Sequence, residues 1–398
     1  MNQLPVRGQP GAMHSGPTSL ATLFGGLLLC VALPGHAQGT SRATAQQAAT
    51  LIPTAATLSA PEAHQIVGLA SQPGARWSGP ASGPPAQPGK TIALLAEDLR
   101  NGGILGVAQG VREAARTIGW NVSIFDAKGT PAGRAKAFAD ALESKPDGLV
   151  LCGADAVENK AALQPFAARR VPVVGWHSGA RPGPVAGGLV ATNITTDPLE
   201  VARVTALAAV LQSGGRAGVV VFTDSRFEIA MAKADAMAQV IRACTGCTLL
   251  EVRDVAISDS AAKMPAVTRA LLDRYGPRWT HALAINDIYF DYAVPALTAA
   301  GLPGHRLSLL SAGDGSASAF LRIQAGTFQA GTVAEPLNLQ GWQAVDELNR
   351  LFARQGVSGY TAPVHLVTAE NLAFDGGKNL SYDPDNGYRD VYRRIWKP

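Results

Sequence analysis

The chain has 398 residues, of which 47% are hydrophobic and only 6% aromatic, and its formal net charge is +4 at pH 7. This length allows two domains of ordinary size, and the abundance of Ala, Gly, Val and Leu is typical of an α/β protein with a large core. No run of Lys or Arg concentrates the small positive charge, so we expect no nucleic-acid partner.

The first 37 residues predict an export signal. Arg7 provides a positive charge, the apolar stretch 20–33 follows it, and Gly35-His36-Ala37 is a small-residue cleavage site. The apolar stretch is shorter than the roughly 20 residues that span a bilayer. We therefore expect cleavage near Ala37 and a soluble mature protein.

Export determines how the cysteines are interpreted. Cys244 and Cys247 form a C-x-x-C pair, which in a cytosolic protein would suggest redox chemistry or half of a zinc site. The second half of a zinc site is absent from the sequence, and the pair falls between a predicted helix and a predicted strand. We expect a structural disulfide in a turn, and a buried free thiol at Cys152.

Residues 38–89 form an N-terminal extension before the regular pattern begins. Residues 38–70 are rich in Ala, Thr and Gln and are compatible with a helix, whereas residues 71–89 are dense in Gly, Pro and Ser and predict an extended linker. Trp77 is the one residue of this linker that we expect to pack on the body of the protein.

From Lys90 onward, apolar strands alternate with amphipathic helices. The predicted strands cover residues 91–97, 121–125, 147–152, 171–176, 188–194, 216–223, 247–255, 281–286, 307–312, 328–334 and 363–368. The predicted helices cover residues 104–118, 132–143, 156–169, 198–212, 228–243, 261–275, 289–300, 316–325 and 337–354. Such alternation implies right-handed βαβ units and mostly parallel sheets.

About ten such units are too many for one small sheet. We therefore predict an α/β fold with two doubly wound parallel-sheet lobes joined by a multi-strand hinge, and with a switch between lobes near residues 193–196. Residues 375–398 end in polar and aromatic residues, which we interpret as turns and a surface segment covering one lobe.

Five of the predicted strands end in a carboxylate. These carboxylates are Glu97-Asp98, Asp224, Asp287, Asp314 and Glu335. Ligands of parallel sheets bind just beyond the carboxyl ends of the strands. Each carboxylate is therefore either a helix cap, worth about 1 kcal/mol, or part of a binding site. We interpret Asp224 as a helix cap.

Aromatic residues accompany several of these strand ends. Trp176, Phe227 and Tyr289 offer flat apolar faces beside carboxylates and amides. This combination suits a sugar ring, which has apolar C–H faces and a rim of hydroxyls, and it also suits a quaternary amine through cation–π attraction.

The turn from Asn101 to Gly106 supports an alternative function. It nearly matches the dinucleotide fingerprint G-x-G-x-x-G, with Asn101 in place of the first glycine, and Asp126 stands where a ribose-binding acid belongs. An exported NAD(P)-type oxidoreductase is therefore the alternative. However, a second carboxylate beside the turn would repel a pyrophosphate, and exported proteins rarely find free nicotinamide cofactor.

Other catalytic patterns are absent from the sequence. It contains no P-loop, no G-x-S-x-G elbow and no histidines at metal-binding spacing. We therefore predict no catalytic residue, no metal, no cofactor and no enzyme activity.

Taken together, several segments resemble the type I periplasmic substrate-binding proteins of ABC importers, above all their ribose- and simple-sugar-binding family. The resemblance covers roughly residues 90–370. It rests on Lys145-Pro-Asp-Gly148-Leu-Val-Leu, Val171-Pro-Val-Val174, Ala284-Ile-Asn286-Asp287, Ala312-Gly313-Asp314-Gly315 and Gly331-Thr-Val-Ala-Glu335-Pro336.

The resemblance implies which residues meet the ligand. Asn286 or Asp287, together with Asp314, would bond ligand hydroxyls, and Arg226, Phe227 and Lys233 fall where the family presents an arginine. Glu335 stands where the family usually has Gln, and Gly313 stands where it usually has Phe. A polyol, an amino sugar and a small amine therefore remain candidate ligands in addition to a sugar. The expected ligand-binding residues are Asp98, Arg100, Asn101, Trp176, Asn193, Arg226, Phe227, Asn286, Asp287, Tyr289, Asp314 and Glu335.

The resemblance also implies a role and a domain organisation. The expected role is a monomeric periplasmic solute-binding protein that captures a sugar or polyol between two lobes, closes about a hinge, and delivers the ligand to an ABC permease in the inner membrane. A periplasmic sensor for a receptor kinase is a second alternative. The expected boundaries are 1–37 for the signal peptide, 38–89 for the extension, 90–195 plus 336–362 for lobe 1, and 196–335 plus 363–398 for lobe 2. The expected hinge strands lie near 193–196, 334–336 and 362–364.

Overall fold

A computed structural model describes residues 59–73 and 76–397 of the chain. The expected signal peptide and residues 38–58 of the extension lie outside the described residues. All described residues belong to one compact unit, 53–398. Among them, no helix has the length and apolar character needed to cross a membrane.

The first six-stranded sheet has the strand order β2-β1-β3-β4-β6-β5. All of its neighbouring strands run parallel except β5, which pairs antiparallel with β6. The strands are β1 (Thr91–Ala96), β2 (Asn121–Asp126), β3 (Gly148–Cys152), β4 (Val173–Trp176), β5 (Gly183–Val185) and β6 (Val190–Ile194). The helices of this lobe are α2 (Gly102–Thr117), α3 (Pro131–Glu143), α4 (Lys160–Ala168) and α10 (Leu337–Phe352).

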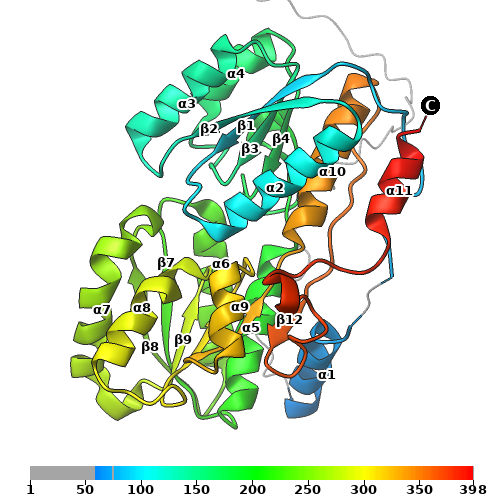
Figure 1. Ribbon diagram of the computed structural model, residues 1–398. Helices are drawn as coiled ribbons and strands as arrows, with labels where there is room; N and C mark the ends of the chain where they lie inside the picture. The colour runs from blue at the N-terminus through cyan, green and yellow to red at the C-terminus, as the bar shows by residue number, and fades with distance from the viewer. Residues whose placement is uncertain (1–58, 74–75, 398) are drawn as a thin grey trace, which may run out of the picture. The chain divides into compact units, whose positions relative to one another are not determined.

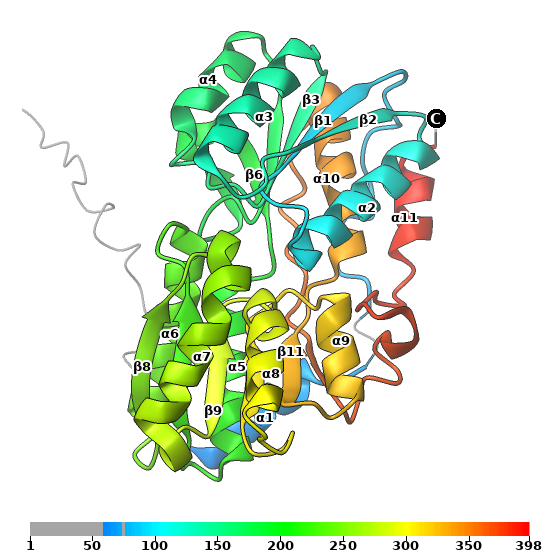
Figure 2. The same cartoon turned by 60° about the vertical axis from the view of Figure 1, so that its left-hand side comes forward.

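Helices cover both faces of this sheet, which explains why its central strands are apolar throughout. Ile92 and Leu94 of β1 face the core made with α2 and α10, whereas Ala93 and Leu95 face the core made with α3 and α4. Figures 1 and 2 show α3 and α4 on one side of the sheet and α2 and α10 on the other.

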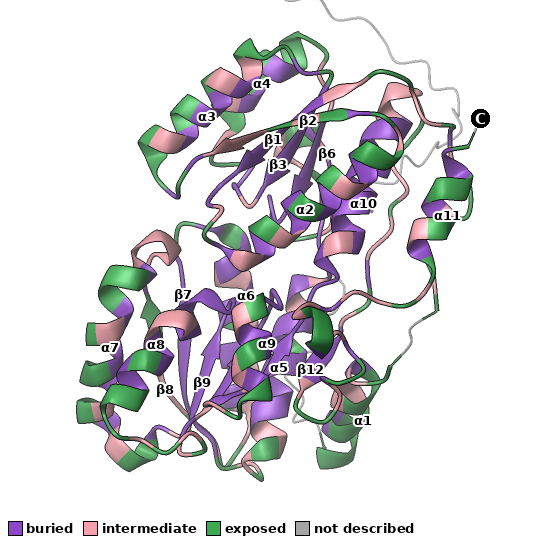
Figure 3. Ribbon diagram, in the orientation of Figure 1, coloured by how far each residue is buried: buried purple, intermediate pink, exposed green. Residues whose placement is uncertain are grey.

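The second six-stranded sheet has the order β12-β11-β10-β9-β7-β8, and only β12 is antiparallel to its neighbour. Its strands are β7 (Gly218–Thr223), β8 (Thr248–Asp254), β9 (His281–Ala284), β10 (Ser308–Ser311), β11 (Gln329–Val333) and β12 (Leu366–Thr368). Its helices are α5 (Pro198–Gln212), α6 (Glu228–Ala243), α7 (Ser260–Tyr275), α8 (Ile288–Ala299) and α9 (Ala317–Gln324). As Figure 3 shows, the central strands of this sheet and the helix faces toward them are buried, whereas the edge strand β8 is partly exposed.

The predicted fold class is confirmed: the chain has two doubly wound, mostly parallel lobes. The chain passes from the first sheet to the second after β6, returns after β11 into α10, and crosses again before β12. The segment 183–185, a short strand of Gly, Pro and Val, was not predicted because it lacks an apolar alternation.

The C-terminal segment, expected to consist of turns and a surface segment covering one lobe, contains a helix. Residues Tyr388–Ile395 form the helix α11, which follows a segment without helix or strand at residues 380–387. Its residues Tyr388, Tyr392 and Ile395 are buried in the core of the first lobe, and Trp396 stacks on Trp342 of α10 at 5.4 Å between ring centroids. The spacing of these apolar residues is helical, and this end of 363–398 therefore packs on lobe 1 rather than on lobe 2. The other expected lobe boundaries stay a prediction.

The described part of the N-terminal extension contains one helix, α1 (Ala60–Ala70), which Ser59 and Glu62 cap reciprocally. Ala70 is buried in the core of the second lobe, where α1 lies on α5. In the linker after it, residues 71–73 and 76–89 have no helix or strand. The predicted packing of Trp77 on the body is confirmed, since its ring lies 5.1 Å from that of Tyr360 and 5.4 Å from that of Tyr392.

Both cysteine predictions are confirmed. Cys244 and Cys247 form a disulfide in the turn between α6 and β8, and Cys152 is a buried free thiol at the end of β3.

Close packing of two helices fixes the start of α2 near the carboxyl ends of the strands. Gly110 of α2 faces Gly341 of α10, and a Cβ at Gly341 would lie 2.5 Å from the backbone nitrogen of Val111. Only glycine allows this approach. The approach holds α2 rigidly, and with it the Asn101 cap at its N-terminus.

Candidate ligand-binding site

One pocket is lined by the carboxyl ends of strands from both sheets and by the loops that follow them. Its polar lining consists of Glu97, Asp98, Asn101, His177, Arg226, Lys233, Ser258, Asn286 and Asp314. Its apolar lining consists of Ile104, Trp176, Phe227, Ile229, Ala230, Ile257 and Ile285, and Gly129 and Gly153 complete the wall.

The structure brings most of the expected ligand-binding residues to this pocket. Those that line it are Asp98, Asn101, Trp176, Arg226, Phe227, Asn286 and Asp314. Arg100 and Asp287 line instead a second pocket beside it, which Asn101 and Asp314 share. Asn193, Tyr289 and Glu335 line neither pocket.

Asp287 organises the site rather than facing the main pocket. Its carboxylate accepts hydrogen bonds from the Ser311 hydroxyl and from the backbone N–H groups of Asp314, Gly315 and Ser316. It therefore fixes the loop after β10 that carries Asp314. A carboxylate that is bonded this fully has little capacity left for a ligand hydroxyl.

Asn193 and Tyr289 also have structural bonds. The Asn193 amide accepts from the backbone N–H of Ser178 and donates to the carbonyl oxygens of Gly179 and Arg181, so it holds the loop after β4. Tyr289 is fully buried, and its hydroxyl donates to the carbonyl of Val255 at 2.8 Å.

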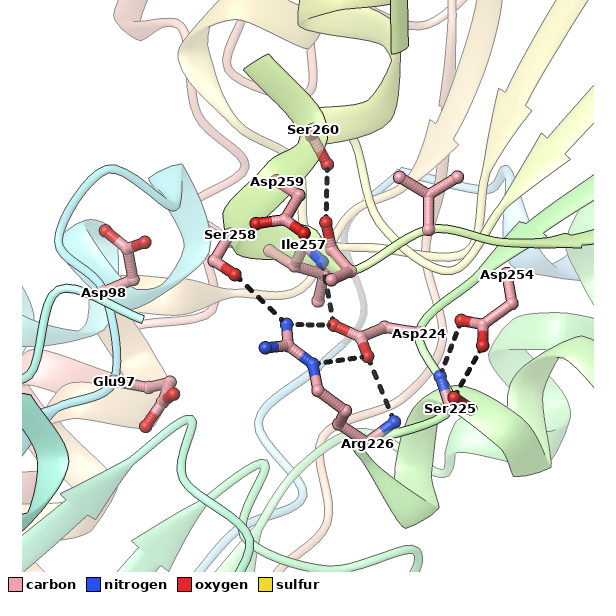
Figure 4. Close-up of polar contacts among 12 residues, drawn as sticks. Glu97, Asp98, Asp224, Ser225, Arg226, Asp254, Ile257, Ser258, Asp259 and Ser260 are labelled. Atoms are coloured by element: carbon pink, nitrogen blue, oxygen red, sulfur yellow. Dashed lines mark hydrogen bonds and ion pairs between the residues drawn. The ribbon is translucent and has the colours of Figure 1, made fainter. Parts of the chain in front are cut away.

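Asp224 is not the helix cap that the sequence suggested, because the N-cap residue of α6 is Phe227. The Asp224 carboxylate instead accepts from Arg226 Nε at 3.0 Å, from Arg226 Nη2 at 2.7 Å and from the backbone N–H of Ile257 at 2.8 Å (Figure 4). Arg226 also donates to Ser258 at 3.3 Å. Asp224 therefore positions one wall of the pocket.

Two further ion pairs occupy the opposite wall, which comes from the first lobe. Arg134 Nε and Nη2 each donate to the Glu97 carboxylate at 2.8 Å, and Arg100 binds the Asp98 carboxylate through Nε and Nη2. Figure 4 shows Glu97 and Asp98 on one side and the Asp224–Arg226 pair on the other. Charges on both walls are thus already compensated within the protein.

A cluster of four groups has unused hydrogen-bonding capacity toward the pocket. The Asn286 side-chain oxygen is buried and has no hydrogen-bond partner among the described residues. His177 Nδ1 lies 4.0 Å from the Asp314 carboxylate, beyond hydrogen-bond distance. Lys233 Nζ donates to the carbonyl of Ala312 at 2.8 Å, which leaves other ammonium protons available.

Glu335 supports this cluster from behind. It is 1% exposed, and its carboxylate lies 2.8 Å from His177 Nε2 and accepts from Gln340 Nε2 at 2.6 Å and from the backbone N–H of Thr196 at 3.2 Å. Burial would raise the pKa of Glu335, but the charges of His177 and Lys233 and the bonds from His177 and Gln340 lower it to about 2. Glu335 is therefore a buried carboxylate that links His177, Thr196 and Gln340, and it lines neither pocket.

Asp314 has the opposite environment. Burial raises the pKa of Asp314 from its ordinary value of 3.8 to about 6, although His177 and Lys233 act in the other direction. A buried carboxylate without hydrogen-bond donors is costly, and donors from a bound molecule would relieve that cost.

His177, Asp314 and Glu335 also place one potential metal-ligand atom each within 4.8 Å of one another. The positive charge near this cluster comes, however, from Lys233, whose ammonium acts on both carboxylates. An ammonium in that position competes with a metal ion, so the geometry favours a charge network of side chains.

Two segments of the first lobe approach the second lobe closely beside the pocket. A Cβ at Gly103 would lie 2.4 Å from Asp314 Oδ2, a Cβ at Gly102 would lie 2.7 Å from the Ser316 Cβ, and a Cβ at Gly129 would lie 3.0 Å from the Ser258 Cβ. Glycine at these positions allows the two lobes to come together around the pocket.

The sequence did not identify several lining residues. His177 was taken as an isolated histidine, and its partner Glu335 is 158 positions away. Ile104, Ile229, Ile257, Ile285 and Ser258 line the pocket without a motif of their own. Glu97 was noted as a strand end, and Lys233 as one of three positions for a cationic residue.

The comparisons with known proteins agree with this architecture. The periplasmic binding protein domain family matches residues 92–355. This match spans more than half of the chain, so the chain belongs to this family, and it has the two-lobed type I fold. No curated protein matches the sequence.

Solved structures with the same fold include sugar- and polyol-binding proteins. A galactofuranose-binding protein has a TM-score of 0.64 at 17% identity, with coverage of 74% of this chain and 100% of that chain. A solute-binding protein of an ABC transporter from Agrobacterium vitis, bound with alpha-D-tagatopyranose, has a TM-score of 0.66 at 16% identity. The match covers 74% of this chain and 99% of that chain. A second solute-binding protein from Agrobacterium vitis, with bound allitol, has a TM-score of 0.61 at 20% identity. The match covers 72% of this chain and 97% of that chain.

Proposed function

We propose that this chain is an exported solute-binding protein that captures a sugar or polyol in the pocket and presents it to an ABC permease. The observation that carries this proposal is the pair of unbonded acceptors, Asn286 and Asp314, at neighbouring strand ends. Sugar and polyol hydroxyls are donors that match such acceptors. Family membership and the ligands of the similar structures support the same class.

The geometry of the Asn101–Gly106 turn argues against the oxidoreductase alternative. In a dinucleotide site a pyrophosphate lies at the start of the first helix. Here the Asp314 carboxylate would lie 2.4 Å from a Cβ at Gly103, at the start of α2. A carboxylate there repels a pyrophosphate, so the proposed function involves no nicotinamide cofactor and no reaction.

The first experiment is a thermal-shift screen of the full chain against sugars and polyols. A ligand that binds only the folded state raises the melting temperature, and the rise grows with ligand concentration. We expect Asn286→Ala to remove most of this rise, because it deletes the unbonded acceptor. Asn379→Ala, which changes an exposed asparagine, should keep it. A screen without any concentration-dependent rise would refute the proposed function.

Ligand capture should also depend on the glycines between the lobes. We expect Gly103→Ala to weaken the ligand found in the screen about tenfold, because overpacking costs roughly 1–3 kcal/mol. The added Cβ would clash with Asp314 in the closed arrangement. Stability without ligand should not fall, since alanine favours a helix more than glycine does. Isothermal titration calorimetry measures the affinity.

Gly68→Ala is the matched control, because a Cβ at this helical glycine meets no atom within 4 Å. If Gly103→Ala and Gly68→Ala bind the ligand equally well, the close approach of Gly103 to Asp314 has no part in capture.

A further inference from the structure

The two lobes also meet on the side of the pocket that lies farthest from the chain crossings. The chain leaves the first sheet after β6 and leaves the second after β11, and it enters the second again at β12. Gly129 follows β2 and Ser258 follows β8, which are the edge strands at the other ends of the two sheets. A rotation of the lobes about the crossings moves this side most. It is therefore the mouth of the pocket.

A close contact between the lobes lies at this mouth. A Cβ at Gly129, in the first lobe, would lie 3.0 Å from the Ser258 Cβ of the second lobe and 2.7 Å from Asp98 Oδ2 of the first. Asp98 and Ser258 therefore flank the same glycine. Ser258 accepts a hydrogen bond from Arg226 Nη2 at 3.3 Å, which places the Arg226 guanidinium beside the contact.

Arg226 has hydrogen-bonding capacity left at this contact. Its Nε and Nη2 donate to Asp224, which is 1% exposed, so that side of the guanidinium is fixed. Nη1 carries two N–H groups, and they have no hydrogen-bond partner among the residues that the structure describes. Figure 4 shows Glu97 and Asp98 of the first lobe across from the Asp224–Arg226 pair of the second. The hydrogen bonds to Asp224 raise the pKa of Arg226 most, and the charge of Glu97 acts in the same direction from across the pocket.

Asp98 is the carboxylate of the first lobe that can accept these N–H groups. Its side chain is 6% exposed, and the side chain of its cationic partner Arg100 is 59% exposed. An ion pair with so exposed an arginine contributes little, and a carboxylate has lone pairs for further donors. Glu97 is held instead by the buried Arg134. Asp98 can therefore take a second cationic partner from the other lobe.

We propose that Arg226 is a latch that holds the lobes closed at the mouth: its Nη1 binds the Asp98 carboxylate across the contact, while Nε and Nη2 stay on Asp224. This inference rests on the proposed function and adds to it a residue that positions the lobes. A charge-assisted hydrogen bond between the lobes exists only in the closed form, so it raises the closed fraction and the apparent affinity with it. For a partly exposed pair we expect about a tenfold effect on affinity.

A double-mutant cycle measures the latch through ligand affinity. Isothermal titration calorimetry on the full chain, with D-galactose, D-tagatose and allitol as probes, compares Arg226→Gln, Asp98→Asn and the double variant. We expect each single substitution to weaken the tightest-binding probe about tenfold. The double variant should weaken it no more than the single ones do, because both substitutions remove the same bond.

Arg274→Gln is the matched control, because it changes an exposed arginine of the second lobe that pairs with Glu251 at 3.2 Å and does not line the pocket. It should bind the probes as tightly as the wild type does. Single variants at Arg226 and Asp98 that also bind like the wild type would overturn the latch. A roughly hundredfold loss in the double variant would show two separate ligand contacts and would overturn it as well.

A cross-linking experiment tests the latch without any ligand. The cysteines of Gly129→Cys/Ser258→Cys lie near the Cβ separation of a disulfide, so oxidation of the full chain should join the lobes. Mass spectrometry of peptides under non-reducing conditions measures the rate. Gly187→Cys/Ser258→Cys should not cross-link, because Gly187 has a similar positive φ but a Cβ there meets no atom within 4 Å.

Adding Arg226→Gln or Asp98→Asn to the Gly129→Cys/Ser258→Cys protein should slow cross-linking severalfold, because the closed fraction falls. An effect of charge on thiol reactivity would act in opposite directions, since one substitution removes a cation and the other an anion. No cross-link, unchanged rates, or rates that change in opposite directions would overturn the latch. If no probe binds and the thermal-shift screen is also negative, the proposed function is wrong, and the cross-linking rates still decide the latch.

Discussion

Replacing Asp314 with asparagine is expected to stabilise the ligand-free protein at pH 8 by up to about 3 kcal/mol and to remove ligand binding. Asp314 is 4% exposed, and burial raises its pKa from 3.8 to about 6. Asparagine keeps the shape of the side chain but removes the buried charge. The residue that we expect to bind the ligand is therefore one that destabilises the empty protein.

The pH dependence of this effect follows from the direction of the shift. Between pH 3.8 and about 6 the unfolded chain has lost the Asp314 proton while the folded protein retains it. The contribution of Asp314 to the free energy of unfolding therefore falls as pH rises through that window, and the contribution stays low at higher pH. The stabilisation by Asp314→Asn should be absent below pH 3.8 and complete above about pH 6.

Urea unfolding of the wild type and of Asp314→Asn at pH 4, 6 and 8 measures this difference. Asp287→Asn is a control of opposite sign, because Asp287 Oδ2 accepts three backbone N–H bonds while Oδ1 accepts from the Ser311 hydroxyl and the Gln329 amide, and asparagine has only one acceptor oxygen. It should destabilise the protein by about 1–3 kcal/mol. A loss of stability in Asp314→Asn at pH 8, or a ligand-induced thermal shift like that of the wild type, would contradict the role given to Asp314.

Glu335→Gln is expected to destabilise the folded protein by about 3 kcal/mol at neutral pH. Burial alone would raise the pKa of Glu335, but His177, Lys233 and Gln340 lower it from 4.5 to about 2. The stability from this group is therefore fully present above pH 4.5 and is lost as pH falls through about 2. The difference between wild type and Glu335→Gln should shrink over the same window.

Urea unfolding at pH 7 and pH 3, with His177→Gln and the double variant, tests this prediction. Because His177 Nε2 lies 2.8 Å from Glu335, the two substitutions should couple strongly rather than add. Asp140→Asn is the surface control: its pair with Lys136 is largely exposed, so stability should change by less than about 1 kcal/mol. Additive effects of the His177 and Glu335 substitutions would show that the pair does not act as one unit.

The local sequence pattern predicted the lobes well because each βαβ unit carries its own signal. Strands such as β3 and β7 are continuous apolar runs, which only a sheet covered on both faces requires. The switch near residues 193–196 followed from the number of units. The C-x-x-C disulfide also closes within four residues, so it needs no knowledge of distant parts of the chain.

Where a prediction failed, a distant partner decided the outcome. Helix α11 was not predicted, although the spacing of its apolar residues is helical, because its buried face packs on Trp342 of α10, which is far away in the sequence. Asp224 was taken as a cap because caps are the commonest use of a carboxylate before a helix. Its actual partners, Arg226 and the backbone of Ile257, depend on how the loop after β8 folds back.

By itself the sequence determined the two-lobed α/β architecture and the placement of polar side chains at the carboxyl ends of strands. These features depend on hydrophobic periodicity and on the direction of parallel strands, which are local properties. Only the tertiary structure decided which acidic side chains already have hydrogen-bond or ion-pair partners and which can still accept hydrogen bonds. Asp287, Asp314 and Glu335 all follow apolar strands, yet backbone N–H groups satisfy the first, burial leaves the second without donors, and His177 stabilises the third. The charge state of a buried group depends on every group packed around it, and those groups come from strands and loops far apart in the chain.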